Sequence, residues 1–224
     1  SIQYFNGSDL VVAKLSPDGT ALMASTFIGG TGNDGLNISI STRYNYGDDF
    51  RGEIIVDGSG NSYIASTTAS TDFPIVSGFQ PTFGGGTTDA CTFKLNSNLS
   101  ALVWSSYLGG SGDDAGYAVQ FDLGYDVYVC GGTTSLDFPT TPGVLNPTIQ
   151  GGVDGYVTHI SNGGSTLIAA TYIGTASYDQ SYFVQLDTNN NVYLLGQSEG
   201  TYSIIPDSVI GVIYSNPGGN QFIH

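Results

Sequence analysis

Apolar and polar residues alternate along short stretches of this chain, and three of the stretches open in the same way. Each of the three begins with an aspartate. They are residues 9–15, 89–95 and 154–160. In the first stretch, Val11, Ala13 and Leu15 fall on one face of an extended chain. Because the side chains of a strand alternate between its two faces, this pattern predicts β-strands.

A second apolar run follows each opening after a polar turn, which predicts a β-hairpin. In the first turn, residues 16–19, proline presets its own φ angle and glycine accepts a positive one. Two further runs complete each unit, and a tyrosine recurs at the same place in the last run. These tyrosines are Tyr63, Tyr128 and Tyr193. Each unit therefore has four predicted strands and no convincing helix.

The units repeat along the chain and belong to one predicted domain that spans residues 1–224. They cover approximately residues 9–88, 89–153 and 154–219, and a further unit opens at Asn220. The first unit is the longest because residues 36–51 are inserted in it. Four antiparallel strands per repeat, with a period above forty residues, are typical of the blades of a β-propeller.

The predicted fold is thus all-β, with blades that are four-stranded antiparallel sheets. The linkers after the fourth strands are expected to carry the chain to the next blade. Asp9, Asp89 and Asp154 are expected to anchor the turns between blades. Three blades are too few for a closed ring, which typically has four to eight. We therefore expect a part of a larger propeller, or a ring that several copies complete.

Two motifs of the units match a known repeat. A Gly-rich loop follows the second run, at residues 27–34 and 107–114, and an Asp-Phe-Pro linker ends at Pro74 and at Pro139. In this order the motifs resemble the SBBP β-propeller repeat of bacteria, over nearly the whole chain except the insertion and residues 202–216. The resemblance implies a large secreted or surface-attached protein. It implies no shared catalytic residues.

The charge of the chain limits the classes of partner that we expect it to bind. Four lysines and arginines stand against nineteen acidic residues, which gives a net charge of −15. Nucleic acids and anionic membranes both need a basic surface, so neither is an expected partner. No apolar run is long enough for a transmembrane helix. The two cysteines, Cys91 and Cys130, make no disulfide framework and are expected to be free and buried.

The Gly-rich loops offer the first candidate site. Their Gly-Gly-x-Gly-x-Asp pattern resembles the calcium turns of β-rolls, but those turns recur about every nine residues and these do not. A single calcium ion in each loop remains a candidate, with Asp34, Asp113 or Asp114 as ligands. The alternative is a structural turn whose aspartate accepts backbone N–H groups. No cofactor other than calcium is suggested.

The insertion offers the second candidate site. It carries half of the positive charge of the chain together with three aromatic residues. Loops on a rigid scaffold often carry binding, and tyrosine and arginine are good anchors for sugars or proteins. We therefore predict a ligand-binding group of Arg43, Tyr44 and Tyr46. The alternative is a hairpin without a binding role.

The sequence leaves two functions open. The first is a non-catalytic extracellular or cell-surface module for adhesion, protein scaffolding or ligand binding. Its partners would be other domains of a longer chain, further copies of itself, or a protein or glycan ligand. The second is a carbohydrate-binding or carbohydrate-active propeller, a lectin or a glycoside hydrolase. We do not expect an enzyme. His159 falls at the strand position of Lys94, so its side chain is expected to face solvent.

Overall fold

The computed structural model describes residues 7–201 and 221–223, and these residues form an all-β structure, as predicted. The strands are β1 (Leu10–Leu15), β2 (Leu22–Ile28), β3 (Glu53–Val56), β4 (Ser62–Thr68), β5 (Asp89–Leu95), β6 (Leu102–Leu108), β7 (Asp114–Phe121), β8 (Val127–Thr133), β9 (Asp154–Ile160), β10 (Leu167–Ile173), β11 (Asp179–Leu186), β12 (Val192–Ser198) and β13 (Gln221–Ile223). Within the described ranges there is no helix, and hence none that is long and apolar enough to cross a bilayer.

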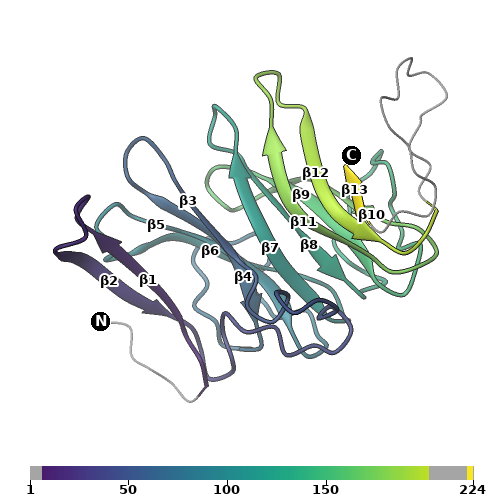
Figure 1. Ribbon diagram of the computed structural model, residues 1–224, viewed down its shortest axis with the longest axis horizontal. Helices are drawn as coiled ribbons and strands as arrows, with labels where there is room; N and C mark the ends of the chain where they lie inside the picture. Colours follow the sequence, from purple (N-terminus) through teal and green to yellow (C-terminus); the bar gives the residue numbers. More distant parts are fainter. Residues whose placement is uncertain (1–6, 202–220, 224) are drawn as a thin grey trace.

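The strands form four antiparallel sheets in which each strand pairs with its neighbours in the sequence. The first sheet contains β1 and β2, the second β3 to β6, the third β7 to β10, and the fourth β11 to β13. In Figure 1 the sheets follow one another in chain order, from the purple β1 at one side to the yellow β13 at the other. We call β1 and β2 the first hairpin, and β5 and β6 the second hairpin.

The sheets are out of phase with the repeat units. β4 pairs with β5, and β8 pairs with β9, so each full sheet joins the last two strands of one unit to the first two of the next. The Asp-Phe-Pro linkers therefore connect strands of the same sheet, and the prediction that they lead to the next blade is wrong. The chain passes from sheet to sheet at the Gly-rich loops instead, as between β6 and β7.

The linker can stay within one sheet because it runs along the edge strand of that sheet. The amide of Ser105 in β6 donates to the carbonyl of Val76 at 2.8 Å, and the amide of Tyr107 donates to the carbonyl of Gln80 at 3.2 Å. These bonds occupy backbone groups of β6 that would otherwise stay unpaired at the sheet edge. The linker between β8 and β9 runs along the edge strand β10 in the same way, through a backbone hydrogen bond of Thr141.

Adjacent sheets pack face to face through apolar side chains. The largest core cluster lies between the second and third sheets and includes Tyr63, Trp104, Val119, Val129 and Tyr156. β7 packs against β3, β4 and β5, and β11 packs against β7, β8 and β9. Large aromatic side chains supply most of the apolar area buried in such a core. The first strand of the third and fourth sheets therefore forms the main contact with the sheet before it.

Both cysteines are free and buried, as the sequence predicts. Cys91 lies in β5 and Cys130 in β8, both in apolar clusters. Burial raises the pKa of both thiols, which keeps them protonated. They act as small apolar side chains of the core.

Candidate functional site

The insertion, residues 36–51, packs against β7 and β11 and buries polar side chains there. The buried polar residues of the insertion are Asn37, Ser39, Thr42 and Asp48. The carbonyl oxygen of Thr42 accepts a hydrogen bond from the hydroxyl of Tyr117 at 2.7 Å and another from the side-chain amide of Gln180, also at 2.7 Å. One backbone group of the insertion is thus tied to both the third and the fourth sheet.

Two β-bulges place tyrosines against the insertion. The pairing register shifts at Tyr117 in β7 and at Tyr182 in β11. A bulge leaves one residue out of the ladder and changes the direction of its side chain. The hydroxyl of Tyr182 accepts a hydrogen bond from the side-chain amide of Asn45 at 2.6 Å. Burial raises the pKa of both phenols far above the usual range, so both keep their protons.

Arg51 fixes the end of the insertion. Its Nε lies 3.2 Å from Oδ1 of the buried Asp48, and its guanidinium lies 4.3 Å from the ring centroid of Tyr182. Oδ2 of Asp48 accepts a hydrogen bond from the backbone amide of Asn45 at 2.8 Å. A charged pair with these additional contacts is held in one geometry. The insertion is therefore a fixed part of the structure.

The three predicted ligand-binding residues face different surroundings. Arg43 pairs with Asp49, with 3.1 Å between Nε and Oδ1. The ring of Tyr44 packs at a tilted angle on that of Tyr178, with ring centroids 4.5 Å apart. Tyr46 is 92% exposed. Arg43 and Tyr44 are thus engaged within the chain, and a shared ligand for the three residues stays a prediction.

Two of the predicted metal ligands, Asp34 and Asp114, hold the Gly-rich loops in shape. Each accepts a hydrogen bond from the backbone amide four residues before it, Gly30 for Asp34 and Gly110 for Asp114, both at 2.8 Å. Each also accepts a hydrogen bond from the hydroxyl group of a linker serine, at 2.8 Å for Asp34 and 2.7 Å for Asp114. This is the geometry of a structural turn that an aspartate holds through backbone N–H groups. Calcium binding there stays a prediction.

Asp113, the third predicted metal ligand, joins the insertion to a linker. Its Oδ2 accepts the hydroxyl of Ser39 at 2.6 Å, and its Oδ1 accepts the backbone amide of Thr87 at 2.6 Å. The two oxygens are thus used by two segments that are far apart in the sequence. Asp113 lies next to Asp114 in the chain but has separate partners.

Aspartates that open the hairpins form buried pairs with aspartates of the Gly-rich loops. The pairs are Asp9 with Asp34, Asp89 with Asp114, and Asp154 with Asp179. In the second pair, Oδ1 of both residues has no hydrogen-bond partner in the described part of the chain. Burial, followed by the charge of Asp114, raises the pKa of Asp89 to about 8, and burial raises that of Asp114 to about 7. This pair therefore holds a proton at neutral pH.

Asp89 and Asp154 also anchor loops, although these loops are linkers within one sheet and not the predicted turns between blades. Asp89 accepts the backbone amide of Gly84 at 2.6 Å, and Asp154 accepts that of Gln150 at 2.7 Å. The pairing of these carboxyl groups was not predicted from the sequence. A signal for it exists, since the two members of each pair are separated by the same number of residues in all three units.

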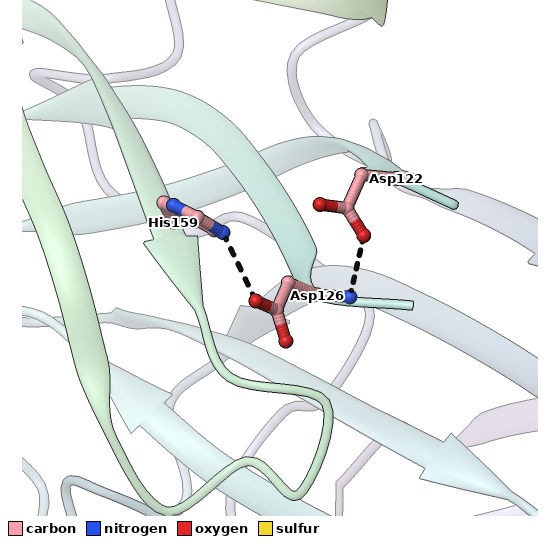
Figure 2. Close-up of side chains that lie close together, drawn as sticks. All are labelled: Asp122, Asp126 and His159. Atoms are coloured by element: carbon pink, nitrogen blue, oxygen red, sulfur yellow. Dashed lines mark hydrogen bonds and ion pairs between the residues drawn. The ribbon is translucent and has the colours of Figure 1, made fainter. Parts of the chain in front are cut away.

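A further group of charged side chains lies at the other end of β7. Asp122 and Asp126 come from the turn between β7 and β8, and His159 comes from β9. Figure 2 shows the three side chains together, and one potential ligand atom of each lies within 4.8 Å of the other two. The prediction that His159 faces solvent is wrong. Its ring stacks on Tyr128, with centroids 4.3 Å apart, and its side chain is only 22% exposed.

The first hairpin differs from the second in the exposure of one face. Val11 is 62% exposed, whereas Cys91, at the same position of the second hairpin, is 0% exposed. Phe27 is 45% exposed, whereas its counterpart Tyr107 is 1% exposed. Among the described strands, β1 pairs with β2 alone, whereas β5 also pairs with β4. The first hairpin therefore has an open edge beside an exposed apolar face.

The corresponding face of the second hairpin is covered by the first hairpin and by the linker of residues 69–88. Val12 and Ile28 of the first hairpin lie in one apolar cluster with Cys91 and Tyr107. From the linker, Phe73 and Phe83 pack on Tyr107 with ring centroids 6.1 and 5.8 Å away. At the edge, β4 pairs with β5 along its whole length. The hydroxyl of Tyr107 donates to the carbonyl of Ser70 at 2.8 Å. The preceding sheet, a linker and a paired strand thus bury on the second hairpin what the first hairpin exposes.

Comparison with known proteins adds no family. Neither a protein-family model nor a curated protein matches the chain. The resemblance to the SBBP repeat therefore stays a prediction, and the function has to be inferred from the structure itself.

Proposed function

We propose that the chain is part of a β-propeller and serves as a non-catalytic scaffolding or adhesion module of an extracellular or surface protein. The observation that carries the proposal is the open edge and exposed face of the first hairpin. The second sheet shows what occupies the equivalent places: a strand pair with its linker at the edge, and a preceding sheet on the face. The partner is a strand pair equivalent to β3 and β4, with its linker, from another repeat of the same type.

The equivalence of the two hairpins extends to their starting points. The backbone amide of Asp34 donates to the carbonyl of Ser8 at 2.6 Å, and that of Asp114 donates to the carbonyl of Thr88 at 2.7 Å. The first hairpin is therefore positioned against its Gly-rich loop as the second one is. A repeat joined at this point would place its strands beside β1 without a change of geometry.

The arrangement of the sheets supports a propeller. The second and third sheets are four-stranded antiparallel meanders, and consecutive sheets pack face to face. A single sheet of this kind has two apolar faces, so it needs a neighbour on each side. Rotation of each sheet about a common axis satisfies both faces and closes into a ring.

The insertion supports a binding role within such a module. Its buried polar network fixes the backbone, while Ile40, Tyr46 and Phe50 stay 86%, 92% and 63% exposed. A rigid loop that displays apolar and aromatic side chains loses little conformational entropy when it binds a protein surface. The insertion is thus the region of this module that is best suited to adhesion.

An extended chain tests the proposed partner. In this chain a copy of residues 53–88 replaces residues 1–8, so that Thr88 of the copy is joined to Asp9. We expect a higher urea midpoint and a larger dependence of unfolding on urea, since the added strands and the first hairpin bury each other. The control carries Ile64→Pro in the copy, which a central strand does not tolerate. Equal midpoints for the extended and the original chain would contradict the proposal.

A further inference from the structure

We propose that Asp122, Asp126 and His159 form a binding site for a divalent transition-metal ion, with zinc as the ion that fits best. The three residues lie where the turn between β7 and β8 meets β9 (Figure 2). The site is far along the strands from the Gly-rich loops, and it does not depend on the proposed function. Each of its ligands is held in place, and the second sheet carries a different set of residues at the same positions.

Each carboxylate is anchored through one oxygen. Oδ1 of Asp122 accepts the backbone amides of Gly124 at 2.7 Å and of Asp126 at 3.0 Å. Oδ1 of Asp126 accepts the backbone amide of Asn162 at 2.8 Å. Backbone bonds of this kind fix the orientation of a carboxylate and raise the precision of a metal site. The Oδ2 atoms remain for a ligand, apart from a contact of 3.2 Å between Oδ2 of Asp122 and the side-chain amide of Asn190.

The histidine is held by stacking. Its ring lies on that of Tyr128 at an interplanar angle of 10°, which fixes the direction of the ring nitrogens. Nε2 of His159 is buried and makes no hydrogen bond with the described residues. Its nearest anion is Oδ2 of Asp126, 3.5 Å away. A buried ring nitrogen without a hydrogen bond is costly, and a metal ion would satisfy it.

The distances and the types of ligand favour zinc. In a tetrahedral zinc site with bonds of about 2.0–2.2 Å, neighbouring ligand atoms are about 3.4 Å apart. The 3.5 Å between Nε2 of His159 and Oδ2 of Asp126 agrees with this value, and the ligand atoms of all three residues lie within 4.8 Å of one another. Calcium and magnesium prefer oxygen ligands alone, whereas one imidazole and two carboxylates suit zinc. The fourth position would be open to water or to a side chain of a partner.

The second sheet provides a natural comparison. At the equivalent positions it has Asp57, Asn61 and Lys94 in place of Asp122, Asp126 and His159. There the ammonium group of Lys94 supplies the positive charge itself, 3.9 Å from Oδ2 of Asp57. It also lies 4.6 Å from the ring centroid of Tyr63, the counterpart of Tyr128. The third sheet has His159 in place of the lysine and Asp126 in place of Asn61. The position that the ammonium group fills in the second sheet is therefore open to a metal ion in the third.

Calorimetric titration of the untagged chain with zinc chloride tests the site. We expect one tight equivalent of zinc per chain and no displacement by an equal concentration of calcium. The double variant Asp126→Asn/His159→Lys copies the residues of the second sheet, so it should keep its fold, as circular dichroism can verify. Its zinc affinity should fall at least a hundredfold. If this variant does not fold, His159→Gln gives the same test, with a loss of at least tenfold expected.

Two further variants locate the ion. The reverse change in the second sheet, Asn61→Asp/Lys94→His, should raise the stoichiometry from one zinc ion to two. His224→Ala should leave zinc binding unchanged, since His224 is the other histidine of the chain. Zinc affinity that survives in a folded His159 variant, or that is lost with His224→Ala, would overturn the proposal, and so would a reverse variant that still binds a single ion.

Discussion

The first and second hairpins have the same sequence pattern but different environments. Both begin with an aspartate, cross a polar turn and end before a Gly-rich loop. Yet Val11 and Phe27 are exposed where Cys91 and Tyr107 are buried. The cause lies outside the hairpins. The first hairpin, a linker and β4 surround the second one, whereas β1 pairs with β2 alone among the described strands.

The contrast shows that a repeat of this kind does not bury its own apolar face. The strands that complete a sheet come from two consecutive units, so each unit depends on its neighbours for burial. We therefore propose the first hairpin as the place where another repeat fits. Four measurements put this dependence between units to the test.

The largest expected effect concerns the aspartates that open the second and third hairpins. Burial raises the pKa of Asp89 to about 8 and that of Asp154 to about 6. Between pH 4 and pH 8 the folded state therefore binds more protons than the unfolded chain does, so the free energy of unfolding falls as pH rises. We expect a loss of several kcal/mol over this range, measured by urea unfolding at each pH.

Substitution separates the two aspartates. Asp89→Asn should remove the part of the fall in unfolding free energy that extends to pH 8. Asp154→Asn should remove the part that ends near pH 6. Asp18→Asn is the control, because the pKa of Asp18 is lowered to about 2 by its hydrogen bond with Ser16, so it is ionised throughout. A pH dependence that Asp89→Asn leaves unchanged would show that Asp89 is ionised in the folded state.

The second effect compares the two hairpins directly. Tyr107→Ala should lower the free energy of unfolding by about 3–5 kcal/mol, since it empties a packed site and removes the hydrogen bond to Ser70. Phe27→Ala, at the matched position, should cost less than about 1 kcal/mol, because its ring is already partly in water. Chemical denaturation of both variants gives the values. Equal losses would mean that Phe27 is covered in solution.

The third effect concerns the insertion. Tyr117→Phe removes one of the two hydrogen bonds to the carbonyl of Thr42, and we expect a loss of about 0.5–1.5 kcal/mol because the bond from Gln180 remains. Tyr46→Phe is the matched control and should change the stability by less than about 0.5 kcal/mol, since Tyr46 is exposed. The same denaturation series measures both. If the two variants were equally stable, the insertion would be attached through other contacts.

The sequence predicted much of the fold because strand periodicity and turn residues are local signals. The all-β class, the hairpins and the buried cysteines are confirmed. The phase of the sheets was not predictable in this way, since β4 and β5 are separated by a linker and their pairing depends on long-range packing. A repeat pattern fixes the order of the strands but leaves open where one sheet ends and the next begins.

The candidate sites were harder to predict for the same reason. The bonds from Tyr117 and Gln180 to Thr42 join residues from three distant segments, and no spacing in the sequence reveals them. His159 was assigned to solvent because it aligns with Lys94, yet both side chains lie against a tyrosine ring in the structure, His159 on Tyr128 and Lys94 on Tyr63. The acidic residue at position 126, where the second sheet has Asn61, was the available signal.

Amide hydrogen exchange of β1 is the most direct test of whether the first hairpin receives another repeat. It would be measured in the original chain and in the extended chain that carries a copy of residues 53–88 ahead of Asp9. Protection of an amide reports the free energy needed to open its hydrogen bond. We predict that exchange in Leu10–Leu15 slows to the level of Asp89–Leu95 once the extension is present. Exchange of β1 that the extension leaves unchanged would contradict the proposed place of a further repeat.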